Sequence, residues 1–128
     1  MTQLEVSIRV EVHPTESREK VESAVRNVLG EVPLTAVDRG DTTVLESSLQ
    51  GVESLSYLRD LLRRTRIRDA ARGILTRTSG EGVMSFGLNK QAAYMGRASF
   101  YGAGESPLGP IQIVITGEVT KVVEYLCR

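Results

Sequence analysis

The sequence predicts a single α+β domain, a two-layer sandwich in which a mixed, mostly antiparallel sheet packs its helices on one face. Segments with an apolar residue at every second position occur in neighbouring pairs, and segments with helical apolar spacing lie between the pairs. The chain has 128 residues, the usual size of one domain, and shows no internal repeat or linker. We therefore treat residues 1–128 as one domain.

The N-terminal segment predicts a strand followed by a helix. Apolar and polar residues alternate over positions 4–12, and His13, which precedes a proline, ends this strand. Thr15 or Ser17 is placed to cap a helix that ends at Gly30. The apolar stripe of this helix consists of Val21, Ala24, Val25, Val28 and Leu29.

A hairpin and a broken helical segment are expected next. Two strands, 32–37 and 43–49, flank the turn-forming quartet 38–41. Residues 54–77 hold two apolar stripes that are out of phase by roughly 170° on one helical wheel, so the helix should break near 64–66. The first stripe is Leu55, Leu58, Leu61 and Leu62. The second is Ile67, Ala70, Ala71, Ile74 and Leu75, of which we expect Ile67, Ala71 and Ile74 in the core.

The C-terminal half completes the sheet. The elements expected are, in order, a loop at 78–82, a strand at 83–88, a short helical turn at 90–95, a strand at 97–101, a loop at 102–110, a strand at 111–115 and a helix at 119–126.

Composition argues against most enzyme and membrane classes. The chain has one cysteine, Cys127, and one histidine, His13, too few for a structural zinc site or an internal disulfide. It lacks a P-loop, and the glycines around Glu81 do not complete a dinucleotide fingerprint. No apolar run is long enough to span a membrane, and no signal peptide is visible. We expect a cytoplasmic protein without catalytic activity, cofactor, metal or membrane contact.

Charge is distributed unevenly along a chain whose formal net charge is zero. Residues 1–53 hold ten acidic and five basic side chains, whereas residues 54–97 hold nine basic and three acidic ones. Seven arginines crowd into 59–77, namely Arg59, Arg63, Arg64, Arg66, Arg68, Arg72 and Arg77. Arginine suits phosphate because its planar fork donates two parallel hydrogen bonds. A solvated helix face with local pairs to Asp60 and Asp69 is the alternative interpretation.

A second candidate segment follows the predicted strand 83–88. Asn89, Lys90 and Gln91 offer donors and acceptors where a loop begins. Asn89 is also well placed simply to cap the helical turn that follows.

Several segments resemble an uncharacterised archaeal protein family that has been labelled RNA-binding and sometimes exosome-related. The matching blocks are RTRIRDAAR at 64–72, LNKQAA at 88–93, SPLGPI at 106–111 and HPTE at 13–16. The resemblance implies a fold similar to ribosomal protein L-five, and it supplies no catalytic residue. Residues 76–82 and 101–105 do not follow the family pattern.

Together these observations predict an RNA-binding protein that contacts the phosphate backbone. The expected contacts are Arg63, Arg64, Arg66, Arg68, Arg72, Asn89, Lys90 and Arg97. With few aromatic residues in the sequence, base stacking is not expected. The main alternative is an assembly module that forms a homodimer through its oppositely charged halves. A small-ligand site around Asn89, Lys90, Gln91 and the 106–110 loop is a third possibility.

Overall fold

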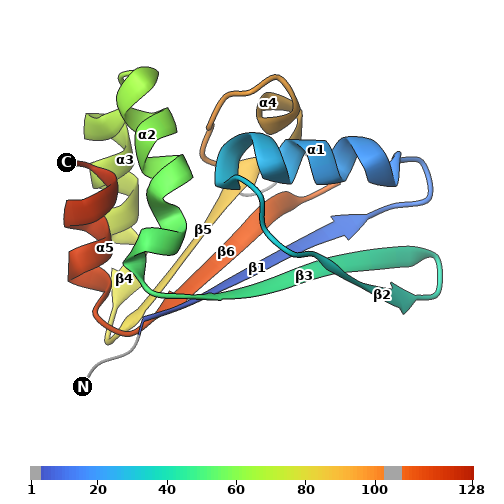
Figure 1. Ribbon diagram of the computed structural model, residues 1–128, viewed down its shortest axis with the longest axis horizontal. Helices are drawn as coiled ribbons and strands as arrows, with labels where there is room; N and C mark the ends of the chain where they lie inside the picture. Colours follow the sequence, from blue (N-terminus) through green and yellow to red (C-terminus); the bar gives the residue numbers. More distant parts are fainter. Residues whose placement is uncertain (1–3, 103–107) are drawn as a thin grey trace.

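A six-stranded antiparallel sheet forms one layer of the molecule, and the described helices all lie on one side of it (Figure 1). The computed structural model describes residues 4–102 and 108–128. The strand order is β2-β3-β1-β6-β5-β4, and every neighbouring pair is antiparallel. The strands are β1 (Glu5–Val12), β2 (Thr35–Arg39), β3 (Thr42–Gln50), β4 (Ser79–Gly80), β5 (Val83–Asn89) and β6 (Pro110–Thr116). The α+β sandwich predicted from the sequence is confirmed.

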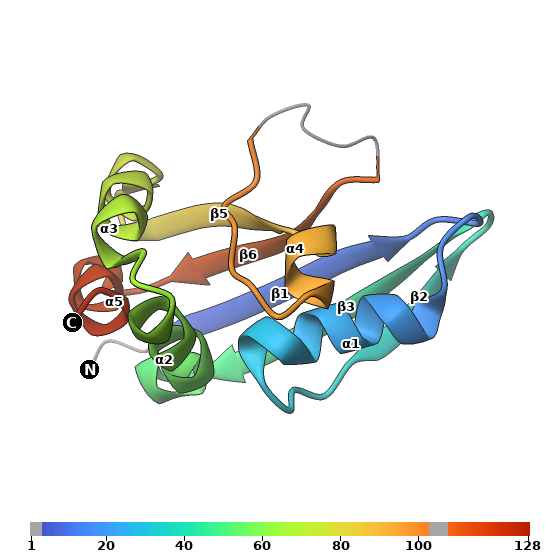
Figure 2. The same cartoon turned by 90° about the horizontal axis from the view of Figure 1, so that it is seen from above.

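The helices form two groups above the sheet (Figures 1 and 2). One group covers the right-hand part of the sheet and contains α1 (Arg18–Leu29) and α4 (Lys90–Tyr94). The other group covers its left end and contains α2 (Ser56–Arg64), α3 (Arg68–Arg77) and α5 (Val119–Leu126). A short 3-10 turn, η1 (Val52–Leu55), leads from β3 into α2.

Strict alternation along the central strands produces this one-sided arrangement. In β1 the even-numbered residues are buried and the odd-numbered ones exposed, because successive side chains of a strand point to opposite faces. β5 and β6 follow the same pattern, so their apolar side chains meet the helices. The core of the central strands consists of Val6, Ile8, Val10, Met84, Phe86, Leu88, Ile111, Ile113 and Ile115.

Helix α1 begins and ends where the sequence indicates. The Ser17 hydroxyl accepts a hydrogen bond from the backbone amide of Lys20 at 3.4 Å, so Ser17, not Thr15, is the cap. Gly30 has a φ of 82°, and its amide donates to the Arg26 carbonyl at 2.9 Å. A Cβ at Gly30 would lie 3.2 Å from the Tyr57 side chain. Glycine is therefore required here both for its backbone conformation and for the close packing of α2 on α1.

The predicted break in the long helical segment is confirmed. α2 ends at Arg64, α3 begins at Arg68, and Arg66 between them has a left-handed φ of 61°. The prediction for the second apolar stripe was partly wrong. Ala71 is fully buried and Ile67 packs partly buried against the core, but Ile74 is only half-buried, and Leu75 is the fully buried residue of that turn.

Three boundaries differ from the predicted ones. Residues 79–80 pair with β5 as strand β4, where a loop was expected. Residues 97–101 form no regular strand. They pair with β5 only at an isolated antiparallel bridge between Leu88 and Phe100. Strand β2 begins at Thr35, because Pro33 cannot donate to a strand ladder. Within the predicted loop 102–110, positions 103–107 lie outside the described residues.

None of the described helices has the length and apolar character needed to cross a membrane.

Candidate nucleic-acid interface

The predicted arginine cluster lies on α2, α3 and the turn between them. Six of its residues are exposed: Arg63, Arg64, Arg66, Arg68, Arg72 and Arg77. Arg59 differs from them, because its guanidinium stacks over the Tyr125 ring at 4.6 Å and pairs with Asp60 at 3.4 Å. Arg59 therefore fastens α2 to α5, while the other six reach the surface.

Three of these arginines meet at the C-terminal end of α5. Arg63 and Arg68 donate to the backbone oxygen of Arg128 at 3.5 and 2.7 Å, and Arg72 donates to the carbonyl of Cys127 at 3.3 Å. Cations are favourable at this end of a helix, where carbonyl groups lack intrahelical partners. These backbone oxygens orient the three guanidiniums at the end of α5.

Cys127, beneath these arginines, is a buried free thiol. Burial raises its pKa, against a smaller lowering by the nearby Arg72 and Arg68. The thiol is therefore protonated at neutral pH, unlike a nucleophilic cysteine.

Within the described part of the chain, the arginine cluster is almost free of aspartate and glutamate partners. Its one ion pair is Arg59–Asp60; the other ion pairs join residues elsewhere. The local pairs that the alternative interpretation requires, to Asp60 from Arg64 and to Asp69 from Arg68, do not form. The six exposed arginines therefore have no aspartate or glutamate partner among the described residues.

Lys90 does not lie where a phosphate contact requires it. Lys90 is only 8% exposed. The ammonium group donates to the carbonyl of Glu11, to the carbonyl of Leu108 at 2.9 Å and to the carboxylate of Glu16 at 3.0 and 3.3 Å. The His13 ring also bonds to the Leu108 carbonyl, at 3.0 Å. Lys90, which the sequence analysis expects to contact phosphate, instead lies buried beside a carboxylate and two carbonyls, an environment that periodicity does not reveal.

This network joins three sequence blocks that are distant in the chain. Glu16 and His13 come from the β1–α1 turn, Lys90 from the start of α4, and Leu108 from the segment before β6. Ser106 and Pro107 of the last block lie outside the described residues. The blocks thus hold one structural junction together.

Asn89 and Arg97 flank α4. The Asn89 side chain accepts from the Ala92 amide at 2.9 Å, so it caps α4 as the structural alternative predicted. Arg97 is exposed just after α4, next to Gly96, and its backbone amide donates to the Ala92 carbonyl at 2.9 Å. Of these two candidates, Arg97 is the one on the exposed surface.

Exposed aromatic residues gather beside Arg64, which nothing in the sequence indicated. Tyr57 of α2 is 44% exposed, Tyr94 of α4 is 46% exposed and Met95 is 69% exposed. These three residues and Arg64 line one hollow of about 400 Å³ where α1, α2 and α4 meet. Tyr57 and Tyr94 are far apart in the chain, so a local pattern could not bring them together.

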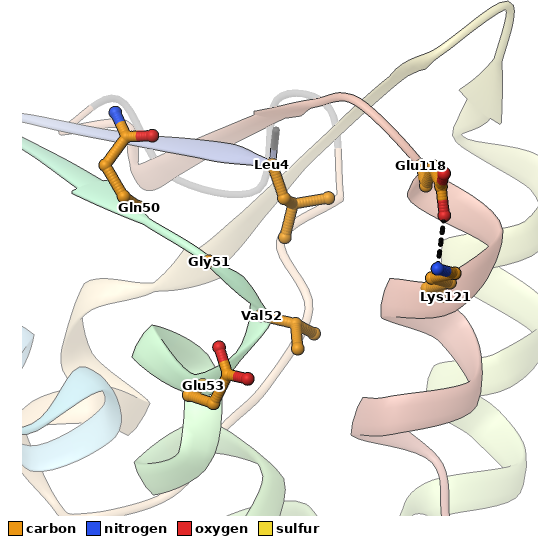
Figure 3. A pocket seen from close by; sticks show the side chains of 7 residues that line it. All are labelled: Leu4, Gln50, Gly51, Val52, Glu53, Glu118 and Lys121. Atoms are coloured by element: carbon orange, nitrogen blue, oxygen red, sulfur yellow. Dashed lines mark ion pairs between the residues drawn. The ribbon is translucent and has the colours of Figure 1, made fainter. Parts of the chain in front are cut away.

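Two other hollows are more acidic. One lies where the strands end beside α5, and Figure 3 shows its Lys121 directed toward Glu118; their charged groups are 2.6 Å apart. Glu53 also lines this hollow (Figure 3). A second hollow lies on the open face of the sheet and has Glu5 and Glu46 beside Arg9. Neither offers a surplus of cations to a polyanion.

No group of three or more histidine, cysteine, aspartate or glutamate residues in 4–102 and 108–128 is arranged to hold a metal ion.

Comparison with known proteins supports the resemblance seen in the sequence. A family model described as "RNA binding" matches residues 5–117. A UPF0201 protein of Aeropyrum pernix is 41% identical over 128 residues, covering 98% of this chain and 85% of the relative. A UPF0201 protein of Thermococcus kodakarensis is 37% identical, covering 95% of this chain and 88% of the relative.

Solved structures agree. The crystal structure of a UPF0201 protein from Methanococcus jannaschii is 31% identical and superposes with a TM-score of 0.86, covering 97% of this chain and 99% of that one. A similarity to ribosomal protein L-five and a link to the exosome stay predictions. The chain belongs to the UPF0201 family of archaeal proteins, whose matching family model is described as RNA binding.

Proposed function

We propose that this protein binds RNA, without catalysis, through the arginines of α2 and α3. Phosphate groups would meet Arg63, Arg64, Arg66, Arg68 and Arg72, with Arg97 as a further contact. The observation that supports this most is the absence of aspartate and glutamate partners for these guanidiniums in the described part of the chain. Like charges gathered on one surface repel one another, and a bound polyanion relieves this repulsion.

The best test removes charge without disturbing the fold. Arg68 and Arg72 are unsuitable, because they also bond to the carbonyls that end α5. Arg63→Gln with Arg66→Gln is preferable, since Arg63 bonds only at 3.5 Å and the Arg66 side chain makes no hydrogen bond within the described residues. Glutamine also keeps a long side chain at position 66, where the backbone has a left-handed φ, so the backbone strain there stays as in the wild type.

A matched control removes two charges from the opposite face. Arg9 on β1 and Arg39 on β2 are exposed residues of the open sheet face, and Arg9→Gln with Arg39→Gln changes the net charge equally. Binding of single-stranded RNA should weaken in the first variant, with the slope of log affinity against log salt shallower by about 1.4. The control should keep the wild-type slope. Equal weakening in both variants would mean that overall charge, not this surface, governs binding.

Assembly is the second candidate function, and the carboxylates of the open sheet face, opposite the arginine-bearing helices, favour it. Exposed Glu5 and Glu11 and half-buried Glu46 lie on the open sheet face, whereas the arginines lie on the helical side. A contact between unlike faces of two copies would be head-to-tail and salt-sensitive. Sedimentation equilibrium at low and high salt tests this idea. A monomer at low salt would remove it.

A further inference from the structure

Two hollows share one ridge on the helical side, formed by Tyr94 and Met95. The hollow toward α2 is the one of about 400 Å³ that Tyr57 and Arg64 line. The hollow on the other side of the ridge measures about 500 Å³ and is lined by Lys20 and Gln91, among others. We call this surface, consisting of Lys20, Gln91, Tyr94, Met95, Tyr57 and Arg64, the tyrosine groove.

Hydrogen bonds at both ends of α4 hold the ridge in place. The Asn27 side-chain amide donates to the carbonyls of Ala93 and Tyr94, both at 3.1 Å, and so ties the end of α4 to α1. At its other end, α4 is anchored by buried Lys90, which bonds to Glu16. A helix of only five residues would not be stable alone. These contacts therefore present Tyr94 and Met95 in a fixed position at the surface.

Tyr57 is fixed as well. Its side chain packs against Gly30, where a Cβ would lie only 3.2 Å away. Two tyrosines and a methionine are thus exposed next to each other on well-anchored helices, although burying them would be favourable. An exposed apolar cluster with a polar rim is typical of a binding surface.

The charges around the groove select the kind of ligand. Lys20 places its ammonium 5.9 Å from the centroid of the Tyr94 ring, and Arg64 lies beyond the ridge beside Tyr57. The one carboxylate among the described lining residues, Glu16, is 12% exposed and paired with Lys90. The groove is therefore aromatic in the middle and cationic at both ends. Gln91, exposed at its edge, offers an amide donor and acceptor.

We infer that the tyrosine groove binds unpaired nucleobases, with Tyr94 and Tyr57 as stacking platforms and Lys20 and Arg64 on the flanking phosphates. This inference rests on the proposed function and narrows its ligand to single-stranded RNA. Bases in a duplex are already stacked on their neighbours, whereas bases of a single strand are free to stack on aromatic side chains. The arrangement also explains how a chain with few aromatic residues recognises a single strand: the fold gathers two of them at one place.

The test compares three probes: an oligoadenylate of about 12 nucleotides, the same strand in a duplex with oligouridylate, and an abasic ribose-phosphate strand of equal length. Tyr94→Ala should weaken oligoadenylate binding about 5- to 150-fold, the range measured for loss of one stacking contact. Binding of the duplex and of the abasic strand should change little. Tyr94→Phe keeps the ring and should bind as the wild type does. Tyr57→Ala should behave like Tyr94→Ala.

Fluorescence of 2-aminopurine placed in the single strand gives a second readout of base stacking, because stacking on tyrosine quenches this fluorescence. Tyr94→Leu keeps an apolar side chain at position 94 but should lose the quenching. If the wild type binds RNA but Tyr94→Ala binds all three probes as the wild type does, or loses all three equally, the groove is not a base site and the proposed function stands. If the wild type binds none of the probes at low salt, the proposed function fails and this inference with it.

Discussion

Replacing Lys90 with methionine should destabilise the fold by about 3–5 kcal/mol, the usual cost of removing one partner from a buried ion pair. Methionine fills a similar volume, so the loss arises from the groups left behind and not from a cavity. Those groups are the Glu16 carboxylate, 12% exposed, and the carbonyls of Glu11 and Leu108. Urea unfolding followed by circular dichroism measures the change in the free energy of unfolding.

A second variant separates charge from packing. Lys90→Met combined with Glu16→Gln removes the unpaired buried charge, while the side-chain carbonyl of the introduced glutamine can still accept from the His13 amide, as Glu16 Oε1 does at 2.9 Å. We expect the double variant to recover part of the lost stability, on the order of 1–3 kcal/mol. A loss below about 1 kcal/mol for Lys90→Met alone, typical of an exposed pair, would refute the assignment of Lys90 to a buried structural junction.

Three further outcomes are expected from unfolding experiments. Leu75→Ala should lower the free energy of unfolding by about 2–5 kcal/mol. Ile74→Ala, at a half-buried position of the same turn, should lower it clearly less. Equal losses in the two variants would contradict the observed orientation of α3. Arg66→Gly should leave stability unchanged or raise it by up to about 1 kcal/mol, because it relieves a left-handed φ of 61°. Gly87→Ala should cost about 1–3 kcal/mol, since the added Cβ would lie 2.8 Å from the Pro110 side chain; a neutral result would contradict this packing.

Periodicity was sufficient to predict most of the architecture. The alternation in residues 4–12 predicted β1 and its buried face, and the opposed phases of the two leucine- and isoleucine-containing stripes predicted the break at Arg66. The stripe on α3 did not distinguish Ile74 from Leu75, because both fit one broad apolar face. The packing of α3 against α5, α2 and β5 decides which residue is buried.

The candidate site was less predictable because it depends on contacts distant in the chain. In the sequence Lys90 resembles a solvated cation, yet Glu16, 74 residues away, pairs with it. Tyr57 and Tyr94 produced no local signal, and they meet only because α1, α2 and α4 converge. The arginine cluster was visible in the sequence. Only the packing of α3 and α5 reveals that its exposed members have no aspartate or glutamate partner among the described residues.

The salt dependence of RNA binding by the wild-type protein tests the central claim most directly. If the five arginines Arg63, Arg64, Arg66, Arg68 and Arg72 meet phosphates of a single strand, log affinity should fall against log salt with a slope of about −3.5. Fluorescence anisotropy of a labelled oligoadenylate at several salt concentrations measures it. A slope near that value is the expected result. Absence of binding to single-stranded RNA even at low salt would contradict the account and leave assembly as the function to pursue.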